Sequence, residues 1–95
     1  MMADTHSVTV EAIVERPLSA DELLRLGACV PGCVGATAVP FAPTRVRVTM
    51  CLDGDDPDER ADAGTWFVTN ALALCGHAGS VQVAGEGPAE HRRSA

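Results

Sequence analysis

The sequence contains no lysine and no tyrosine, and its aromatic side chains are limited to two phenylalanines and one tryptophan. A core without many rings must be built from valine, alanine, leucine and cysteine, which bury less apolar area per residue. At 95 residues the chain is long enough for one domain but lies near the lower limit for a self-sufficient core. We therefore expect a homodimer to supply part of the stability.

Positive charge is also scarce: 7 arginines face 13 aspartates and glutamates, which gives a formal net charge of −6. This balance excludes nucleic acid and anionic membranes as expected partners, since both require a basic surface. No apolar run approaches the ~18 residues of a membrane-spanning helix. The N-terminal residues lack the basic and apolar regions of a signal peptide, which predicts a cytoplasmic location. The absence of lysine, with abundant alanine, glycine, valine and aspartate, is typical of a GC-rich bacterial genome.

Few residues are suited to acid–base catalysis. His6 precedes the first strand, His77 follows a helix and His91 lies in the C-terminal tail. No Ser-His-Asp arrangement and no glycine-rich phosphate loop is present. The sequence therefore favours a protein that binds without catalysing a reaction.

What the sequence does contain is an ordered series of hydrophobic segments. Their periodicity predicts strands over residues 7–14, 33–41, 45–52 and 80–84, and helices over residues 19–27 and 57–75. Two β-α-β halves joined by a turn form the split βαβ, or ferredoxin-like, pattern. We expect an α+β fold (βαββαβ) in which a four-stranded antiparallel sheet carries both helices on one face. The domain should span residues 7–85, with flexible termini at residues 1–6 and 86–95.

Local signals mark the starts of both helices. Ser19 and Glu22 have capping-box spacing, and Asp56 before Pro57 fits a cap followed by proline at the first helical position. Pro40 favours an edge position for the second strand, because proline cannot donate to a ladder. The predicted inner face of the second helix consists of Gly64, Phe67, Val68, Ala71, Leu74 and Cys75.

The turn Val30-Pro31-Gly32-Cys33-Val34 resembles the helix-to-strand turn of heavy-metal-associated domains and of small regulatory ligand-binding domains of the ACT type. Heavy-metal-associated domains bind copper through two cysteines in the loop after their first strand. Here that loop, residues 15–19, has no cysteine, so copper chaperoning does not carry over. RNA recognition on this fold is not expected either, because the third strand offers no aromatic rings for base stacking.

Four cysteines raise the question of a metal site. We predict that both helices end at one edge of the sheet, where Cys29, Cys33, Cys75 and His77 would meet, with Cys51 at the opposite end. Those side chains suit tetrahedral zinc. Free cysteine is also commonly buried as a small apolar residue, so core packing, a disulfide and a zinc site are the three alternatives. Core packing is favoured, with no cofactor. The acidic loop of residues 53–56 is interpreted as helix capping.

The sheet face opposite the helices offers a second candidate site. Glu11 and Arg47 lie on strands expected to be neighbours, so they form a cross-strand pair, or Arg45 and Arg47 hold a carboxylate or phosphate. Ile13 on the same face suits a dimer contact. Trp66 lies off the apolar face of its helix and suits an interface or ligand pocket, or else the edge of the core.

Three functions follow from these features. The favoured one is a dimeric ferredoxin-like module that binds a small molecule or a protein. An alternative resembles cofactor-independent ferredoxin-like monooxygenases and isomerases, in which Trp66, Arg45 and Arg47 would position a small organic substrate in a deep pocket. The third is a thiol or zinc protein that uses the cysteines.

Overall fold

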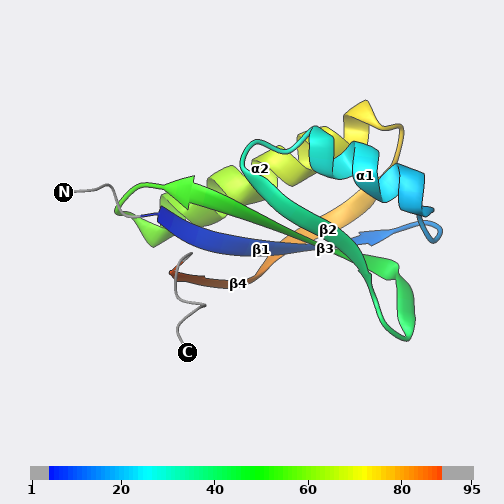
Figure 1. The fold of residues 1–95 in the computed structure, drawn as a ribbon, viewed down its shortest axis with the longest axis horizontal. Helices are drawn as coiled ribbons and strands as arrows, with labels where there is room; N and C mark the ends of the chain where they lie inside the picture. The colour runs from blue at the N-terminus through cyan, green and yellow to red at the C-terminus, as the bar shows by residue number, and fades with distance from the viewer. Residues whose placement is uncertain (1–4, 89–95) are drawn as a thin grey trace.

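The computed structural model describes residues 5–88, which form four strands and two helices in an α+β arrangement (Figure 1). The elements follow in the order β1 (Thr5–Val14), α1 (Ala20–Ala28), β2 (Cys33–Val39), β3 (Ala42–Asp53), α2 (Pro57–Leu74) and β4 (Gly79–Pro88). Neither helix is long and apolar enough to cross a lipid bilayer within the described part of the chain.

The strands form one antiparallel sheet in the order β2-β3-β1-β4. Both helices lie on the same face of this sheet, as Figure 1 shows, and the other face carries no element of the described chain. α2 packs over β1, β3 and β4, whereas α1 packs mainly against β2. The edge position predicted for β2 from Pro40 is confirmed.

Alternation along β1 separates the two faces. Val8 pairs with Met50 and Val10 pairs with Val48, and all four side chains are fully buried beneath the helices. Residues between them point to the other face, because successive side chains of a strand alternate. The core consists almost entirely of small and medium-sized side chains: Val8, Val10, Ala12, Val14, Leu18, Leu26, Val30, Val46, Val48, Met50, Val68, Ala71 and Leu72.

Both predicted helix starts are confirmed. The Ser19 hydroxyl accepts a hydrogen bond from the Glu22 backbone N–H at 3.2 Å, and Glu22 Oε1 accepts one from the Ser19 N–H at 2.8 Å. At the start of α2, Asp56 Oδ1 accepts from the Asp58 N–H at 2.9 Å. The acidic loop therefore caps a helix, as its sequence indicated.

Several details differ from the prediction, including the bounds of β2 (Cys33–Val39, not residues 33–41) and of β3 (Ala42–Asp53, not residues 45–52). β4 runs from Gly79 to Pro88, well beyond the predicted residues 80–84, because the β1 backbone continues to offer pairing partners to a polar, glycine-rich segment. On α2, Leu74 is 69% exposed, and Leu72 is buried in its place. β1 also includes Thr5 and His6. The remaining predicted flexible ends, residues 1–4 and 89–95, lie outside the described residues.

Two glycines allow backbones to approach closely. A Cβ at Gly64 of α2 would lie 3.2 Å from Val8 Cγ1 and 3.3 Å from Val10 Cγ2, so glycine lets this helix approach β1. Gly32, in the turn before β2, has a φ of +70°, and a Cβ there would lie 2.6 Å from the Cys51 carbonyl oxygen. The Gly32 carbonyl also accepts a hydrogen bond from the Cys51 N–H at 2.9 Å.

We expect Gly32→Ala to lower the free energy of unfolding by roughly 1–3 kcal/mol, because the new Cβ meets both a left-handed backbone and a carbonyl oxygen. Urea unfolding of the two proteins measures this difference. The matched control is Gly35→Ala, since nothing lies within 4 Å of a Cβ at Gly35. Equal loss of stability in both variants would contradict the expectation.

Candidate functional site: a paired-arginine cluster on the open sheet face

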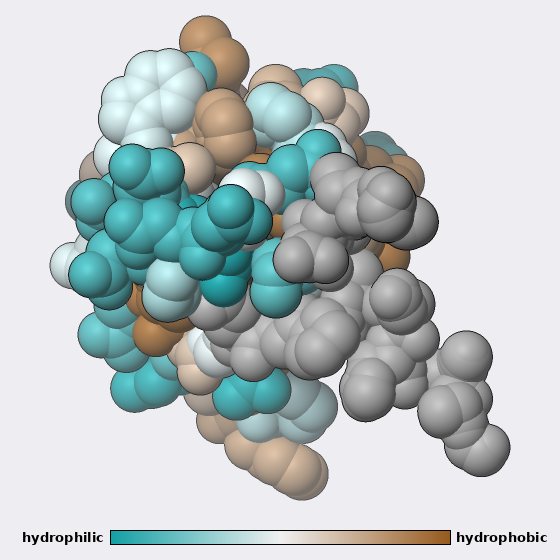
Figure 2. Space-filling view, turned by 90° about the vertical axis from the view of Figure 1, so that its left-hand side faces the viewer, coloured by the Kyte–Doolittle hydropathy of each residue, from teal (hydrophilic) through white to brown (hydrophobic). Residues whose placement is uncertain are grey.

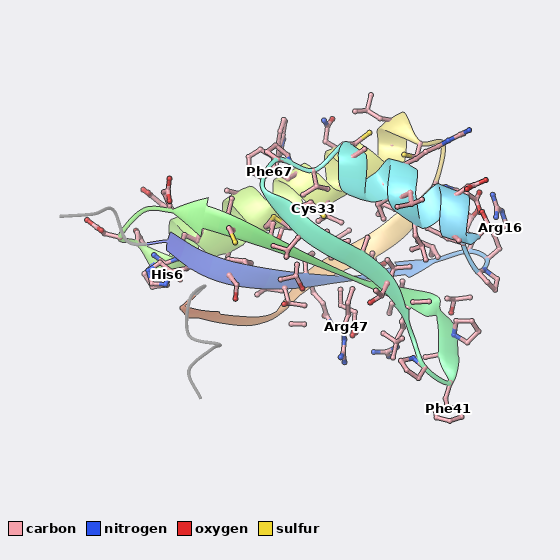
Figure 3. The ribbon with its side chains drawn as sticks, viewed as in Figure 1. His6, Arg16, Cys33, Phe41, Arg47 and Phe67 are labelled. Carbon is pink, nitrogen blue, oxygen red and sulfur yellow. The ribbon has the colours of Figure 1, made fainter. Side chains whose placement is uncertain are left out.

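The face of the sheet opposite the helices carries most of the side chains singled out from the sequence. Glu11 and Ile13 come from β1 and pair in register with Arg47 and Arg45 of β3. Figure 3 shows Arg47 projecting away from the helices on this side. We call Glu11, Arg45 and Arg47 the arginine cluster.

The cluster is built around one buried carboxylate. Arg45 Nη1 donates to Glu11 Oε1 at 2.8 Å, and Arg47 Nε donates to Glu11 Oε2 at 3.2 Å. Glu11 is only 6% exposed, whereas the side chains of Arg45 and Arg47 are 47% and 54% exposed. The predicted cross-strand pair is therefore present, and it includes a second arginine.

This geometry leaves donor capacity facing solvent. A guanidinium has five N–H donors in a fixed planar fork, and Glu11 occupies only one nitrogen of each arginine. Two guanidinium groups against one carboxylate also leave a surplus positive charge on a protein whose formal net charge is −6. The cluster can therefore accept a further anionic group without losing its internal ion pairs.

The surroundings of the cluster are of mixed polarity. Thr9 Oγ1 and Thr49 Oγ1 are hydrogen-bonded across the strands at 3.1 Å on one side, and Ile13, 42% exposed, lies on the other. Gln82 of β4 pairs with Glu11 in register and is exposed. An apolar contact thus lies beside a charged one.

Trp66 does not join the arginine cluster. It belongs to α2, on the opposite face of the sheet, and its side chain is 61% exposed. Its ring meets Phe67 edge-on, with centroids 5.7 Å apart and an interplanar angle of 72°. Phe67 packs against the core. Trp66 therefore lies outside the core, over an aromatic neighbour.

The structure brings together three of the four predicted ligands, Cys29, Cys75 and His77, but not Cys33. β1 and β3 are antiparallel, so the helices that follow them run in opposite directions (Figure 1), and their C-caps lie near each other because α2 is twice as long as α1. Cys33 lies beside Gly27, at the α1–β2 surface, apart from Cys75 and His77. Cys51 lies next to the Cys33 end of β2 rather than opposite it, because its N–H bonds the Gly32 carbonyl.

The four ligands of the predicted zinc site therefore do not come together. Among residues 5–88, no three histidine, cysteine, aspartate or glutamate side chains lie close enough together to hold a metal ion. Cys29, Cys75 and His77 do line a common hollow of about 400 Å³ between α1 and the end of α2, together with Glu22, Arg25, Ala28 and Leu74.

Charged groups from α1 help to form this hollow. Hydrogen bonding by the Arg16 guanidinium, and then by the Ser19 N–H, lowers the pKa of Glu22 to about 2. His77 Nε2 lies 3.7 Å from Glu22 Oε2. Burial, followed by the neighbouring Cys29 thiol, raises the pKa of Cys75. The sequence analysis did not place Glu22 and Arg25 at this hollow. Their helical spacing puts them on one face of α1, but it does not show that α2 ends beside that face.

A further hollow of about 300 Å³ lies at the acidic end of the molecule, where β3 runs into α2. Figure 2 shows the hydrophilic surface at this end. Arg60, which is only 7% exposed, donates from Nη1 to the Gly54 carbonyl at 2.5 Å and so holds the acidic loop against α2. The burial of Arg60 could not be predicted from the sequence, since arginine is ordinarily exposed.

The enzyme alternative required a deep pocket near Trp66, Arg45 or Arg47. The hollows of about 400, 300 and 270 Å³ in the described part of the chain are lined by other residues. The space between helices and sheet is filled by the core side chains. The geometry therefore gives no support to a buried substrate site at these residues.

Comparison of the chain with models of known protein families, with curated proteins and with solved structures gives no match. The candidate function therefore depends on the geometry alone.

We expect Glu11→Gln to lower the free energy of unfolding by about 1–3 kcal/mol, because it leaves two charged donors without their buried carboxylate. Urea unfolding measures this change. Glu15→Gln is the control, since Glu15 is exposed just beyond β1. If both variants unfold alike, Glu11 does not organise the cluster.

Proposed function

We propose that this chain is a non-catalytic, ferredoxin-like binding module whose open sheet face binds an anionic group of a small molecule or protein. The element order βαββαβ, the strand order and the two helices on one face support the ferredoxin-like assignment. The observation that carries the function is the buried Glu11 held between two half-exposed arginines.

The arginine cluster favours a carboxylate or a phosphate. Both groups match the planar fork of arginine and form two parallel hydrogen bonds to it. Glu11 restricts the motion of both guanidinium groups before any ligand arrives, which reduces the entropy lost on binding. Ile13 beside Arg45 offers an apolar contact to the rest of the ligand. A binding module of this kind needs no acid–base residue.

The first test is a titration of the ¹⁵N-labelled protein with inorganic phosphate and, separately, with succinate. We expect saturable shifts of the Arg45 and Arg47 Nε–H signals at constant ionic strength. Replacing both arginines with glutamine should weaken binding at least about tenfold, since hydrogen bonds to charged groups contribute about 1.5–3 kcal/mol.

The control variant is Arg16→Gln. Arg16 pairs with Glu22 at 2.6 Å in an exposed ion pair away from the open face. The Arg16→Gln variant should bind phosphate and succinate as tightly as the unmodified protein does. Absence of saturation, or equal weakening in the Arg16 variant and the double variant, would contradict the proposed function.

We propose in addition that the module is a homodimer joined through the edge strand β2 and helix α1. β2 has a free edge in the sheet, and edge strands offer unpaired backbone groups to another chain. Leu24 and Val34, which are 73% and 68% exposed, border a hollow of about 270 Å³ beside this edge. Pairing of two β2 strands would cover these side chains and leave both arginine clusters open.

Sedimentation equilibrium tests this arrangement. The unmodified protein should sediment as a dimer, and Leu24→Asp should weaken the dimer strongly, because a buried unpaired carboxylate is costly. Leu74→Asp is the matched control, since Leu74 is similarly exposed, at 69%, but belongs to α2. A monomeric unmodified protein, or equal dissociation of both variants, would exclude this interface.

A further inference from the structure

The two helices end on cysteines that have the same local role. Cys29 is the C-cap of α1 and Cys75 is the C-cap of α2, with φ near −89° and −88° respectively. Each cap N–H donates back into the last turn of its helix, so the backbone that carries each thiol is fixed. Neither thiol is a mobile group on a loose loop.

The two cysteines lie in the same hollow beside the helix–helix contact. Both line the hollow of about 400 Å³ between α1 and the end of α2, and the pKa of the Cys75 thiol is raised by its burial and by the neighbouring Cys29 thiol. α2 is twice as long as α1 and runs in the opposite direction (Figure 1). This mismatch in length brings the end of α2 alongside α1 and places the second cap near the first.

Accessibility differs between the two thiols. Cys29 is exposed, whereas Cys75 is half-buried. An oxidant in solution therefore reaches Cys29 first, and Cys75 lies beside it as the group that can complete the reaction.

We propose that Cys29 and Cys75 form a reversible disulfide that links the ends of the two helices when the protein meets a peroxide. The Cys29 thiolate attacks one peroxide oxygen, which gives a sulfenic acid and releases water after protonation. The Cys75 sulfur then displaces the sulfenic hydroxyl, which leaves as a second water, and the S–S bond forms. Two thiols lose two electrons and two protons, and one peroxide is reduced to two waters. A dithiol reductant reverses the step by thiol exchange.

The other two cysteines provide an internal comparison. Cys33 and Cys51 are close along the backbone, since the Cys51 N–H donates to the Gly32 carbonyl at 2.9 Å. Their side chains lie on opposite faces of the sheet: Cys33 Sγ is near Gly27 of α1, whereas Cys51 alternates with the buried Met50. Short backbone separation alone therefore does not predict a disulfide, and this pair should stay reduced.

The experiment treats the reduced full-length protein with hydrogen peroxide in the presence of a chelator. We expect a monomer lighter by two hydrogen atoms, and peptide mapping should place the bond between Cys29 and Cys75. The thermal midpoint should rise by about 10 °C, because the bond closes a long loop in the unfolded chain. Both changes should reverse with dithiothreitol.

Matched variants separate this pair from general thiol oxidation. Cys29→Ser and Cys75→Ser should abolish the monomeric crosslink and the thermal shift, whereas Cys33→Ser and Cys51→Ser should retain both. Three results would overturn the proposal: a bond that includes Cys33 or Cys51, crosslinks between chains only, or sulfinic acid on Cys29 without a crosslink. The arginine cluster takes no part in this test, so its outcome is independent of anion binding.

Discussion

The alternation of side chains along β1 is the constraint on which the rest of the structure depends. β1 lies between β3 and β4, so its register determines the position of both neighbours. Val8, Val10 and Ala12 fill the space beneath the helices, and Glu11 between them points to the open face. A shift of one residue would bury Glu11 against the helices and expose the valines. The core and the arginine cluster are therefore fixed by the same register.

The small core side chains explain where function can reside. Gly64 lets α2 approach Val8 and Val10 so closely that a Cβ there would touch both. A close approach of helix and sheet leaves no room for a ligand between the layers. The hollows and the arginine cluster of the described residues accordingly lie on the outer surfaces: the open sheet face, the helix ends and the sheet edge.

Features encoded by short spacing could be predicted from the sequence, whereas those set by tertiary neighbours could not. The capping box of α1 depends on residues three positions apart. The placement of Glu11 and Arg47 on one face of the sheet depends on the two-residue period of each strand. Leu72 and Leu74 lie on opposite flanks of the apolar face of α2, and only the packed layers decide which is covered. β4 extends into a polar segment because the β1 backbone pairs with it, and no side-chain pattern marks that. Arg60 bonds a carbonyl only six residues away, at Gly54, but no side-chain pattern marks a contact to the backbone.

The positions of the cysteines depend on the directions of the two helices, and the predicted zinc site assumed that both helices end at one edge of the sheet. Helices that follow antiparallel strands run in opposite directions, and within residues 5–88 Cys33 and Cys75 line different hollows. Because the helices run in opposite directions and differ in length, Cys29 and Cys75 line the same hollow. The thiol pair lies on the helix side of the sheet and the arginine cluster on the other side, with the locked register of β1 between them. A covalent bond between the helix ends would constrain the helix layer while leaving the ion pairs of the open face in place, so the proposed disulfide and the proposed anion site would act separately in one small domain.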